Sequence, residues 1–204
     1  MCAGAIFARF LGNAYVLVGN WRVSGFSYPF RQPKIKPGSR EKMKLKIRTK
    51  DLALATIYAA LYAALVIVFT PISFGLAQFR VAGILRPGIA KKWILAFGYG
   101  IGALVANFFS PFAGPWDLVF MPVMSVIAGL AGYFVAKRFG GNYFVCGIVT
   151  ATIIAASLSF MFEQLGIAPM LIAVLPLFAV EQAVCLIGGC IFLLIGKRFA
   201  WWKT

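Results

Sequence analysis

Long apolar runs separated by short polar turns dominate the pattern of the chain. Five runs carry no Lys or Arg and are long enough to cross the ~30 Å hydrocarbon core of a bilayer as helices. They cover residues 52–70, 93–110, 118–136, 142–162, and a last stretch that ends at residue 196 and whose start can be placed as late as residue 176. The pattern predicts an all-α integral membrane protein with at least five spanning helices.

Basic residues decide whether a sixth segment, around residues 76–93, also crosses. With six crossings and a cytoplasmic N-terminus, every later basic pair falls on the cytoplasmic side, and the outer loops contain no Lys or Arg. Five crossings would divide those pairs between the two sides, against the positive-inside rule. The pairs are Lys91 with Lys92, Lys137 with Arg138 and Lys197 with Arg198, and the outer loops are residues 71–79, 110–117 and 162–169. We therefore expect six transmembrane helices with both termini in the cytoplasm.

The second of these six crossings is too short for an ordinary helix. Phe79 to Ala90 is twelve residues, which spans roughly 18 Å at ~1.5 Å per residue. The remaining depth must come from residues 71–78, dipping into the protein from the outer face. Non-helical backbone at that depth is tolerated only beside protein or a watery cavity. A short second helix fed by a dipping outer loop therefore predicts a pocket open to the outside.

Composition supports the membrane assignment and argues against several function classes. Of 204 residues, 62% are hydrophobic and 12% charged, whereas a soluble domain is about a quarter charged. The net charge of +15 comes largely from basic residues that precede the first apolar run, so we expect no nucleic-acid partner. The chain has no His and one carboxylate per segment after the first run, so we expect no enzyme activity, no metal site and no cofactor.

Residues 1–42 differ from the rest of the chain. They hold a weak apolar stretch interrupted by Arg9 and then a segment rich in Pro, Arg and Lys, which fits neither a signal peptide nor a spanning helix. Met43 opens a short basic leader that runs directly into the first apolar run. We expect residues 1–42 to be a disordered or wrongly assigned N-terminal extension, and residues 43–204 to form a single six-helix membrane domain.

Two charged side chains are expected within the membrane. If Lys91 marks the inner boundary, Arg80 lies eleven residues above it, roughly 16 Å along a helix. An arginine at that depth costs about 2.5 kcal/mol or more unless it meets a partner or water. Glu181 lies sixteen residues before Lys197, roughly 24 Å above the inner boundary. An intramembrane carboxylate of this kind is a functional candidate by default.

Other polar residues are expected in the same outer half, at the ends of the apolar runs. The substrate-binding candidates are Gln78, Arg80, Asn107, Trp116, Asp117, Glu181 and Gln182. Plainer interpretations stay open. Asp117 is also suited to the first turn of a helix, where free amides stabilise it. Trp116 is also suited to an interfacial anchor, and Arg80 with Glu181 to a structural ion pair.

Small residues recur along the first apolar run. Ala55, Ala59 and Ala63 are spaced four apart, and such a stripe lets two membrane helices approach closely. The partner of the stripe is either another protein or a helix of this same chain.

Three stretches form a distinctive set, in the order TKDLALATIYAALYAALVIVFTPISFGLAQFRV, GALVANFFSPFAGPWDLVF and VEQAV. Over residues 43–198 the chain resembles the queuosine-precursor branch of the substrate-binding (S) components of energy-coupling factor transporters. The resemblance implies a small six-helix subunit of the cell membrane that binds a vitamin-like nutrient from outside. It also implies a coupling transmembrane subunit, met by Ala55, Ala59 and Ala63, and two ATPase subunits. The chain has Ala82 and Gly83 where such sequences usually continue with Ser-Glu.

The resemblance implies a 7-deazaguanine queuosine precursor as the nutrient. Its donor edge suits a carboxylate, its acceptors suit amide or guanidinium donors, and its flat face suits an aromatic ring. We expect Glu181 or Asp117 to bind the donor edge. We expect Gln78, Asn107 and Arg80 to donate to the acceptors, and Trp116 to stack on the flat face. The alternative function is a stand-alone proton-coupled transporter of a small polar nutrient, with Glu181 or Asp117 as the proton carrier. The sequence has no GxxxxGK[ST] motif, so any ATP-driven step must come from partners.

Overall fold

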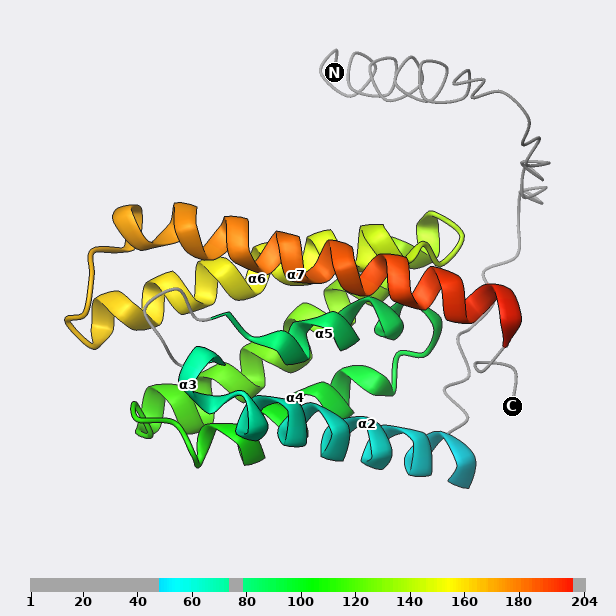
Figure 1. The fold of residues 1–204 in the computed structure, drawn as a ribbon, viewed down its shortest axis with the longest axis horizontal. Coiled ribbons are helices and arrows are strands. Elements are labelled where there is room, and N and C mark those ends of the chain that lie inside the picture. Colours follow the sequence, from blue (N-terminus) through cyan, green and yellow to red (C-terminus); the bar gives the residue numbers. More distant parts are fainter. Residues whose placement is uncertain (1–47, 74–78, 200–204) are drawn as a thin grey trace, which may run out of the picture. The chain divides into compact units, whose positions relative to one another are not determined.

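The computed structural model describes residues 48–73 and 79–199, which all belong to one compact unit, Leu45–Thr204. The regular secondary structure of these residues is entirely helical (Figure 1). The elements are α2 (Thr49–Val68), α3 (Thr70–Ser73), η1 (Val81–Lys91), α4 (Leu95–Asn107), η2 (Trp116–Phe120), α5 (Met121–Arg138), α6 (Tyr143–Gln164) and α7 (Met170–Arg198).

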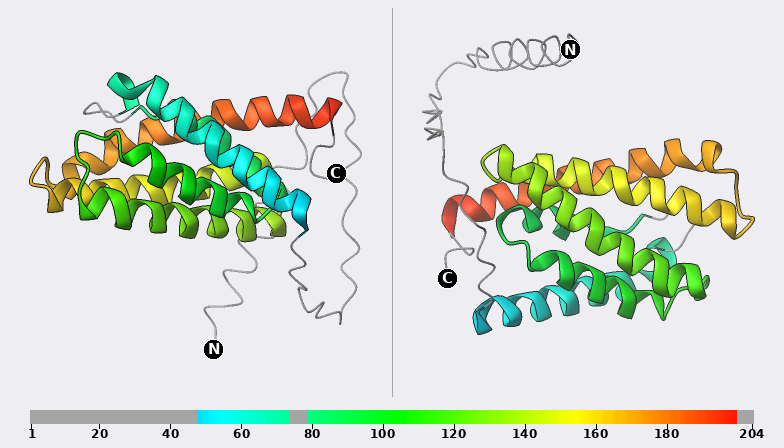
Figure 2. Two further views of the ribbon diagram at one scale, coloured as in Figure 1. Left: turned by 90° about the horizontal axis from the view of Figure 1, so that it is seen from below. Right: turned by 180° about the vertical axis from the view of Figure 1, so that it is seen from behind.

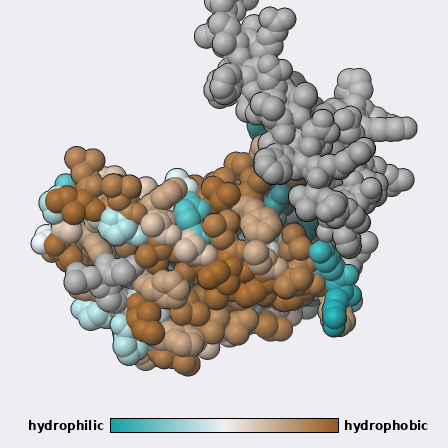
Figure 3. Space-filling view, turned by 45° about the horizontal axis from the view of Figure 1, so that its top comes forward, coloured by the Kyte–Doolittle hydropathy of each residue, from teal (hydrophilic) through white to brown (hydrophobic). Residues whose placement is uncertain are grey.

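Four helices in the described ranges are long and apolar enough to cross a membrane. They are α2, the continuous η2–α5 segment, α6 and α7, while α4 is apolar but has only 13 residues. Large apolar side chains are exposed on their outer surfaces, among them Val68, Leu171 and Leu175. Figure 3 shows apolar residues over most of the visible face of the helices, with strongly hydrophilic ones mainly at one end. Since such a surface suits lipid and not water, the chain is a multi-pass membrane protein.

Basic residues gather at one end of the helical domain, which we call the basic end. Lys92 Nζ lies 2.5 Å from Oδ1 of Asp51 at the start of α2. Lys91 Nζ lies 4.9 Å from the ring centroid of Tyr143 at the start of α6. The basic last turns of α5 and α7 reach the same end (Figure 1). The charge pattern predicted this grouping, whereas the number of crossings and the side of the membrane stay predictions.

The short second segment lies at the centre of the domain. It forms the 3₁₀ helix η1, whose narrower helix rises about 2.0 Å per residue instead of 1.5. Pro87 lies inside η1, lacks a backbone N–H and cannot sit in an ordinary α-helix without disturbing it. η1 packs against α2, α4, α5, α6 and α7. Protein therefore surrounds this irregular backbone, as backbone of this kind needs inside a membrane.

The structure settles one boundary that the sequence left open and changes another. The last helix begins at Met170, and Pro176, the latest expected start, lies within it. A proline inside a membrane helix is tolerated because neighbouring groups satisfy the backbone that it frees. The third expected span, residues 93–110, contains only the 13 residues of α4 as a helix, because turns occupy both of its ends.

The alanine stripe of α2 packs inside the chain. Ala55, Ala59 and Ala63 are all buried, and a Cβ atom added to Gly98 or Gly102 of α4 would lie 2.5 Å from the Ala55 carbonyl oxygen or 2.7 Å from that of Ala59. Small residues on both helices thus let the two backbones approach closely, while α2 runs obliquely across its neighbours (Figure 2). The stripe therefore packs against a helix of this same chain, which was one of its two interpretations. Docking of a partner protein on these alanines stays a prediction.

Several expectations concern residues outside the described ranges. The N-terminal extension, residues 1–42, is one of them, and most of the dipping loop, residues 74–78, is another. Gln78 belongs to that loop. These expectations stay predictions.

Candidate functional site

One group of buried polar residues, the outer polar cluster, consists of Arg80, Asn107 and Asp117. Arg80 immediately precedes η1, Asn107 is the last residue of α4, and Asp117 lies in η2 after a Pro- and Gly-containing turn. Arg80 Nη2 lies 3.9 Å from Asp117 Oδ1. The Asn107 side-chain amide donates a hydrogen bond of 2.7 Å to the Asp117 backbone carbonyl. The turn between α4 and η2 is thereby fixed, and the Asp117 carboxylate is held facing Arg80.

The outer polar cluster contains hydrogen-bond acceptors that lack donors within the cluster. All three side chains are buried, with Asp117 only 1% exposed. The amide oxygen Oδ1 of Asn107 accepts no hydrogen bond from any described residue. Neither carboxylate oxygen of Asp117 has a well-formed hydrogen bond there, although the buried Ser110 hydroxyl lies close enough to interact with this carboxylate. A buried acceptor without a donor is costly. The three atoms therefore offer a ready set of acceptors to a molecule that presents donors.

A second group, the central polar cluster, lies around Arg86 of η1 and Glu181 of α7. Arg86 Nη1 donates a hydrogen bond to Glu181 Oε2, and Nη2 lies 3.4 Å from Oε1. Both side chains are shielded, at 0% and 1% exposure. The possible pair between Arg80 and Glu181 is therefore wrong, because each of these residues has a different partner.

Tyrosine hydroxyls surround the buried ion pair. The Arg86 guanidinium carbon lies 5.4 Å from the ring centroid of Tyr99 in α4. Tyr62 of α2 packs edge-on against Tyr99 with ring centroids 5.0 Å apart, and Tyr58 lies close enough to interact electrostatically with both. The three hydroxyls and Ser125 Oγ of α5 are buried, and Ser125 lies close enough to Tyr99 to interact with its hydroxyl. The hydroxyls of Tyr58 and Tyr62 make no hydrogen bond within the described part of the chain. The central polar cluster thus has unused groups that can both donate and accept.

Glu181 lies deeper than the sequence estimate placed it. The estimate counted from Lys197, but α7 has 29 residues and is roughly 43 Å long at ~1.5 Å per residue, more than the ~30 Å hydrocarbon core. Glu181 faces the middle of η1, because its partner Arg86 lies nearer the basic end than Arg80 does. The polar residues form two clusters at different depths and not one.

Two candidates lie apart from both clusters. Trp116 packs edge-on against Phe120 and Phe160, with ring centroids 5.6 and 5.7 Å away, between η2 and α6. The Gln182 side-chain amide donates hydrogen bonds to the Ile148 carbonyl and to Thr152 Oγ1 of α6 at 3.3 and 3.0 Å. Gln182 therefore links α6 to α7 instead of joining Glu181.

The sequence analysis overlooked the partners of Glu181. Arg86 also lies within the chain's second segment, nearer to Lys91 than Arg80 does. The cost of placing a charge inside a membrane therefore made Arg86 a candidate as well. Tyr58 and Tyr62 are one helical turn apart, which places their hydroxyls on one face of α2. Neither the depth of Arg86 nor the spacing of the tyrosines reveals which other helix each of these residues contacts.

One of three comparisons with known proteins found a match. The QueT transporter family matches residues 52–197, from the start of α2 to the end of α7. Among curated proteins and among solved structures, no significant match was found. The family match covers most of the chain and both polar clusters, and the chain therefore belongs to the QueT transporter family.

Proposed function

We propose that the chain is the membrane-embedded substrate-binding subunit of an energy-coupling factor importer and that it takes up a 7-deazaguanine queuosine precursor. Family membership supports a transporter of a small molecule. In this proposal a coupling transmembrane subunit and two ATPase subunits supply the energy, because the chain has no phosphate-binding loop of its own.

The proposed topology has six crossings, with η1 as the short second one and both termini in the cytoplasm of a cell-membrane protein. The grouping of Lys91, Lys92 and the basic last turns of α5 and α7 supports it, since basic residues favour the cytoplasmic side. The outer polar cluster then faces the exterior half of the membrane. A nutrient arriving from outside would meet it first.

The observation that carries the proposal is the set of unused acceptors in the outer polar cluster. Asp117 Oδ1 and Oδ2 and Asn107 Oδ1 need donors, and the ring N–H and exocyclic amine of a 7-deazaguanine present donors along one edge. Arg80 offsets the carboxylate charge and can also donate to the carbonyl of the base. Gln78, Trp116, Glu181 and Gln182 remain proposed contacts.

Asp117→Asn tests this assignment directly. The change keeps the size of the side chain but replaces one acceptor by a donor, so we expect the affinity for a 7-deazaguanine to fall about 10- to 100-fold. Isothermal titration calorimetry on the purified protein measures the effect. Glu163→Gln is the matched control, because Glu163 is an exposed carboxylate at the end of α6. Equal affinities of all three proteins would show that Asp117 does not contact the ligand.

Association with partners needs its own measurement. Native mass spectrometry of the gently solubilised protein from its own host should show the coupling subunit and two ATPases bound to it. Normal ligand binding by a chain that never co-purifies with these subunits would contradict the importer assembly while leaving the binding role intact.

Stand-alone proton-coupled transport is the second candidate, favoured by the buried Asp117 carboxylate. A buried carboxylate with few partners in a membrane interior is suited to carry a proton. Uptake into vesicles that contain only this chain, and that stops when the proton gradient is dissipated, would establish this function. ATP-dependent uptake that ignores the gradient would reject it.

A further inference from the structure

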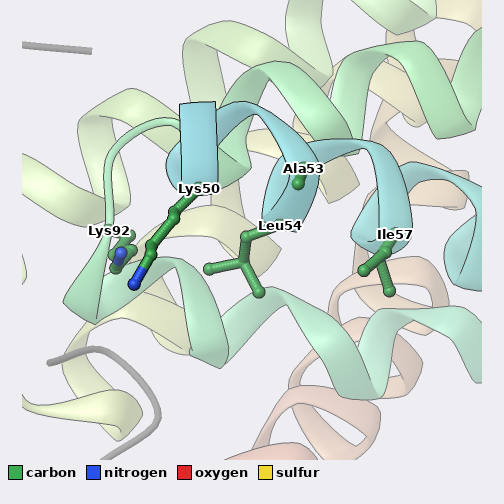
Figure 4. Close-up of a pocket in the computed structure, with 5 residues that line it drawn as sticks. All are labelled: Lys50, Ala53, Leu54, Ile57 and Lys92. Carbon is green, nitrogen blue, oxygen red and sulfur yellow. The ribbon is translucent and has the colours of Figure 1, made fainter. Parts of the chain in front are cut away.

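A pocket of about 230 Å³ lies at the basic end, away from both polar clusters. It lies on the side of α2 that faces away from α4. Lys50, Ala53, Leu54 and Ile57 of α2 line it together with Lys92, which follows η1 (Figure 4). The two ammonium groups lie at one end of the pocket, and Leu54 and Ile57 continue from them along α2 (Figure 4). The pocket therefore has a cationic end and an apolar wall.

The cationic end keeps an excess of positive charge. Lys92 is paired with Asp51, whereas exposed Lys50 makes no ion pair or hydrogen bond in the described part of the chain. Lys50, Asp51 and Lys92 together carry one net positive charge. An anionic group is the ligand that such an end favours.

The apolar wall indicates what carries the anion. Ile57 is 64% exposed and lies one turn further into the span of α2, where hydrocarbon chains surround the protein in a membrane. A small soluble anion would use the lysines and leave Leu54 and Ile57 without a contact. A phospholipid uses both, because its phosphate lies at the level of the lysines and its acyl chain runs along the span.

We propose that this pocket binds one anionic phospholipid of the leaflet at the basic end, with the headgroup phosphate on Lys50 and Lys92 and an acyl chain along Leu54 and Ile57. The lipid occupies the face of α2 that is opposite the face packed on α4. It stabilises the position of α2 where this helix enters the membrane. This site is independent of the transported nutrient.

Native mass spectrometry of the full-length protein with added dioctanoyl phosphatidylglycerol or phosphatidylcholine tests the site. The wild type should retain one phosphatidylglycerol under conditions that remove phosphatidylcholine. Lys50→Gln should weaken this binding about fivefold, and Lys50→Arg should preserve it. Ala53→Phe fills the pocket from an exposed position and should abolish the binding with both lysines still present.

Ala60→Phe is the matched control, because Ala60 is an exposed alanine of α2 outside the pocket and should leave lipid retention unchanged. Equal retention of both lipids, or wild-type retention by Lys50→Gln and Ala53→Phe, would overturn the proposal. Displacement of the lipid by an equal concentration of glycerol phosphate would show that the pocket recognises a soluble anion. If Ala53→Phe releases a co-purifying subunit while lipid retention is unchanged, the pocket belongs to a protein partner.

Discussion

Arg86 and Glu181 are 95 residues apart in the sequence and pair inside the helical domain. A buried ion pair contributes little net stability, because desolvation of both charges opposes their attraction, but loss of one partner leaves the other charge uncompensated. The pair therefore fixes the position of η1 against α7. Gly188 assists, because a Cβ atom there would collide with the Ile84 carbonyl.

We predict that Arg86→Met alone and Glu181→Met alone each lower the free energy of unfolding by about 3–5 kcal/mol. The double variant Arg86→Met with Glu181→Met should be less destabilised than the sum, because it leaves no unpaired buried charge. Thermal unfolding of the purified proteins measures these changes. Strictly additive losses would show that the two side chains do not interact.

The same variants separate stability from ligand binding. If the double variant folds and keeps wild-type affinity for the nutrient, the ion pair is structural only. If it folds and loses affinity while Asp117→Asn also loses it, the ligand contacts both polar clusters.

At the scale of elements, the packing of α2 on α4 depends on glycine. Gly102 lies against the Ala59 carbonyl, and close backbone contact is a main source of cohesion between helices in lipid. η1 depends on small residues in a similar way, since Ala82, Gly83 and Gly88 are buried in it. The central 3₁₀ helix and the oblique crossing of α2 both follow from these small side chains.

We predict that Gly102→Ala lowers the free energy of unfolding by about 1–3 kcal/mol, because the added methyl group overlaps the backbone of α2. Gly114→Ala is the control, since its Cβ atom would meet only the Phe112 carbonyl at 3.6 Å. Both variants can be compared by thermal unfolding in the same detergent. Equal unfolding temperatures for Gly102→Ala and the wild type would contradict this packing.

At the scale of the whole molecule, the proposed six-crossing topology would place the two ends of the domain on opposite sides of the membrane. Arg138 ends α5 at the basic end, and Glu163 is exposed at the far end of α6. A single α6 helix connects the two levels. The direction in which α6 crosses the membrane therefore decides whether the outer polar cluster faces the exterior or the cytoplasm.

We predict that Glu163→Cys reacts with a membrane-impermeant thiol reagent from outside intact cells, and that Arg138→Cys reacts only after permeabilisation. The experiment uses a background in which the native cysteines are replaced. Labelling of Arg138→Cys from outside intact cells would show that the topology is the reverse of the proposed one. The outer polar cluster would then open to the cytoplasm, and the importer proposal would fail with it.

Much of this arrangement was readable from the sequence, with particular exceptions. The apolar runs located α2, α5, α6 and α7, and the charges located the basic end. Arg80, Asn107 and Asp117 belong to a larger polar set that was predicted to gather in one half of the bundle, and the structure brings these three together. The direction of the Gln182 side chain, which points to α6 and not towards Glu181, was not readable. This direction depends on how the long helix α7 is rotated.

The sequence by itself determined that the chain is a helical membrane protein with a short second segment, because the length of an apolar run and the cost of charge in lipid are local properties. Only the tertiary structure decided that this segment is a 3₁₀ helix surrounded by five others, that Arg86 and not Arg80 meets Glu181, and that the alanines of α2 face α4. Those outcomes depend on the rotation, tilt and depth of each helix relative to its neighbours. Packing between distant parts of the chain sets these quantities, and no single run of residues encodes them.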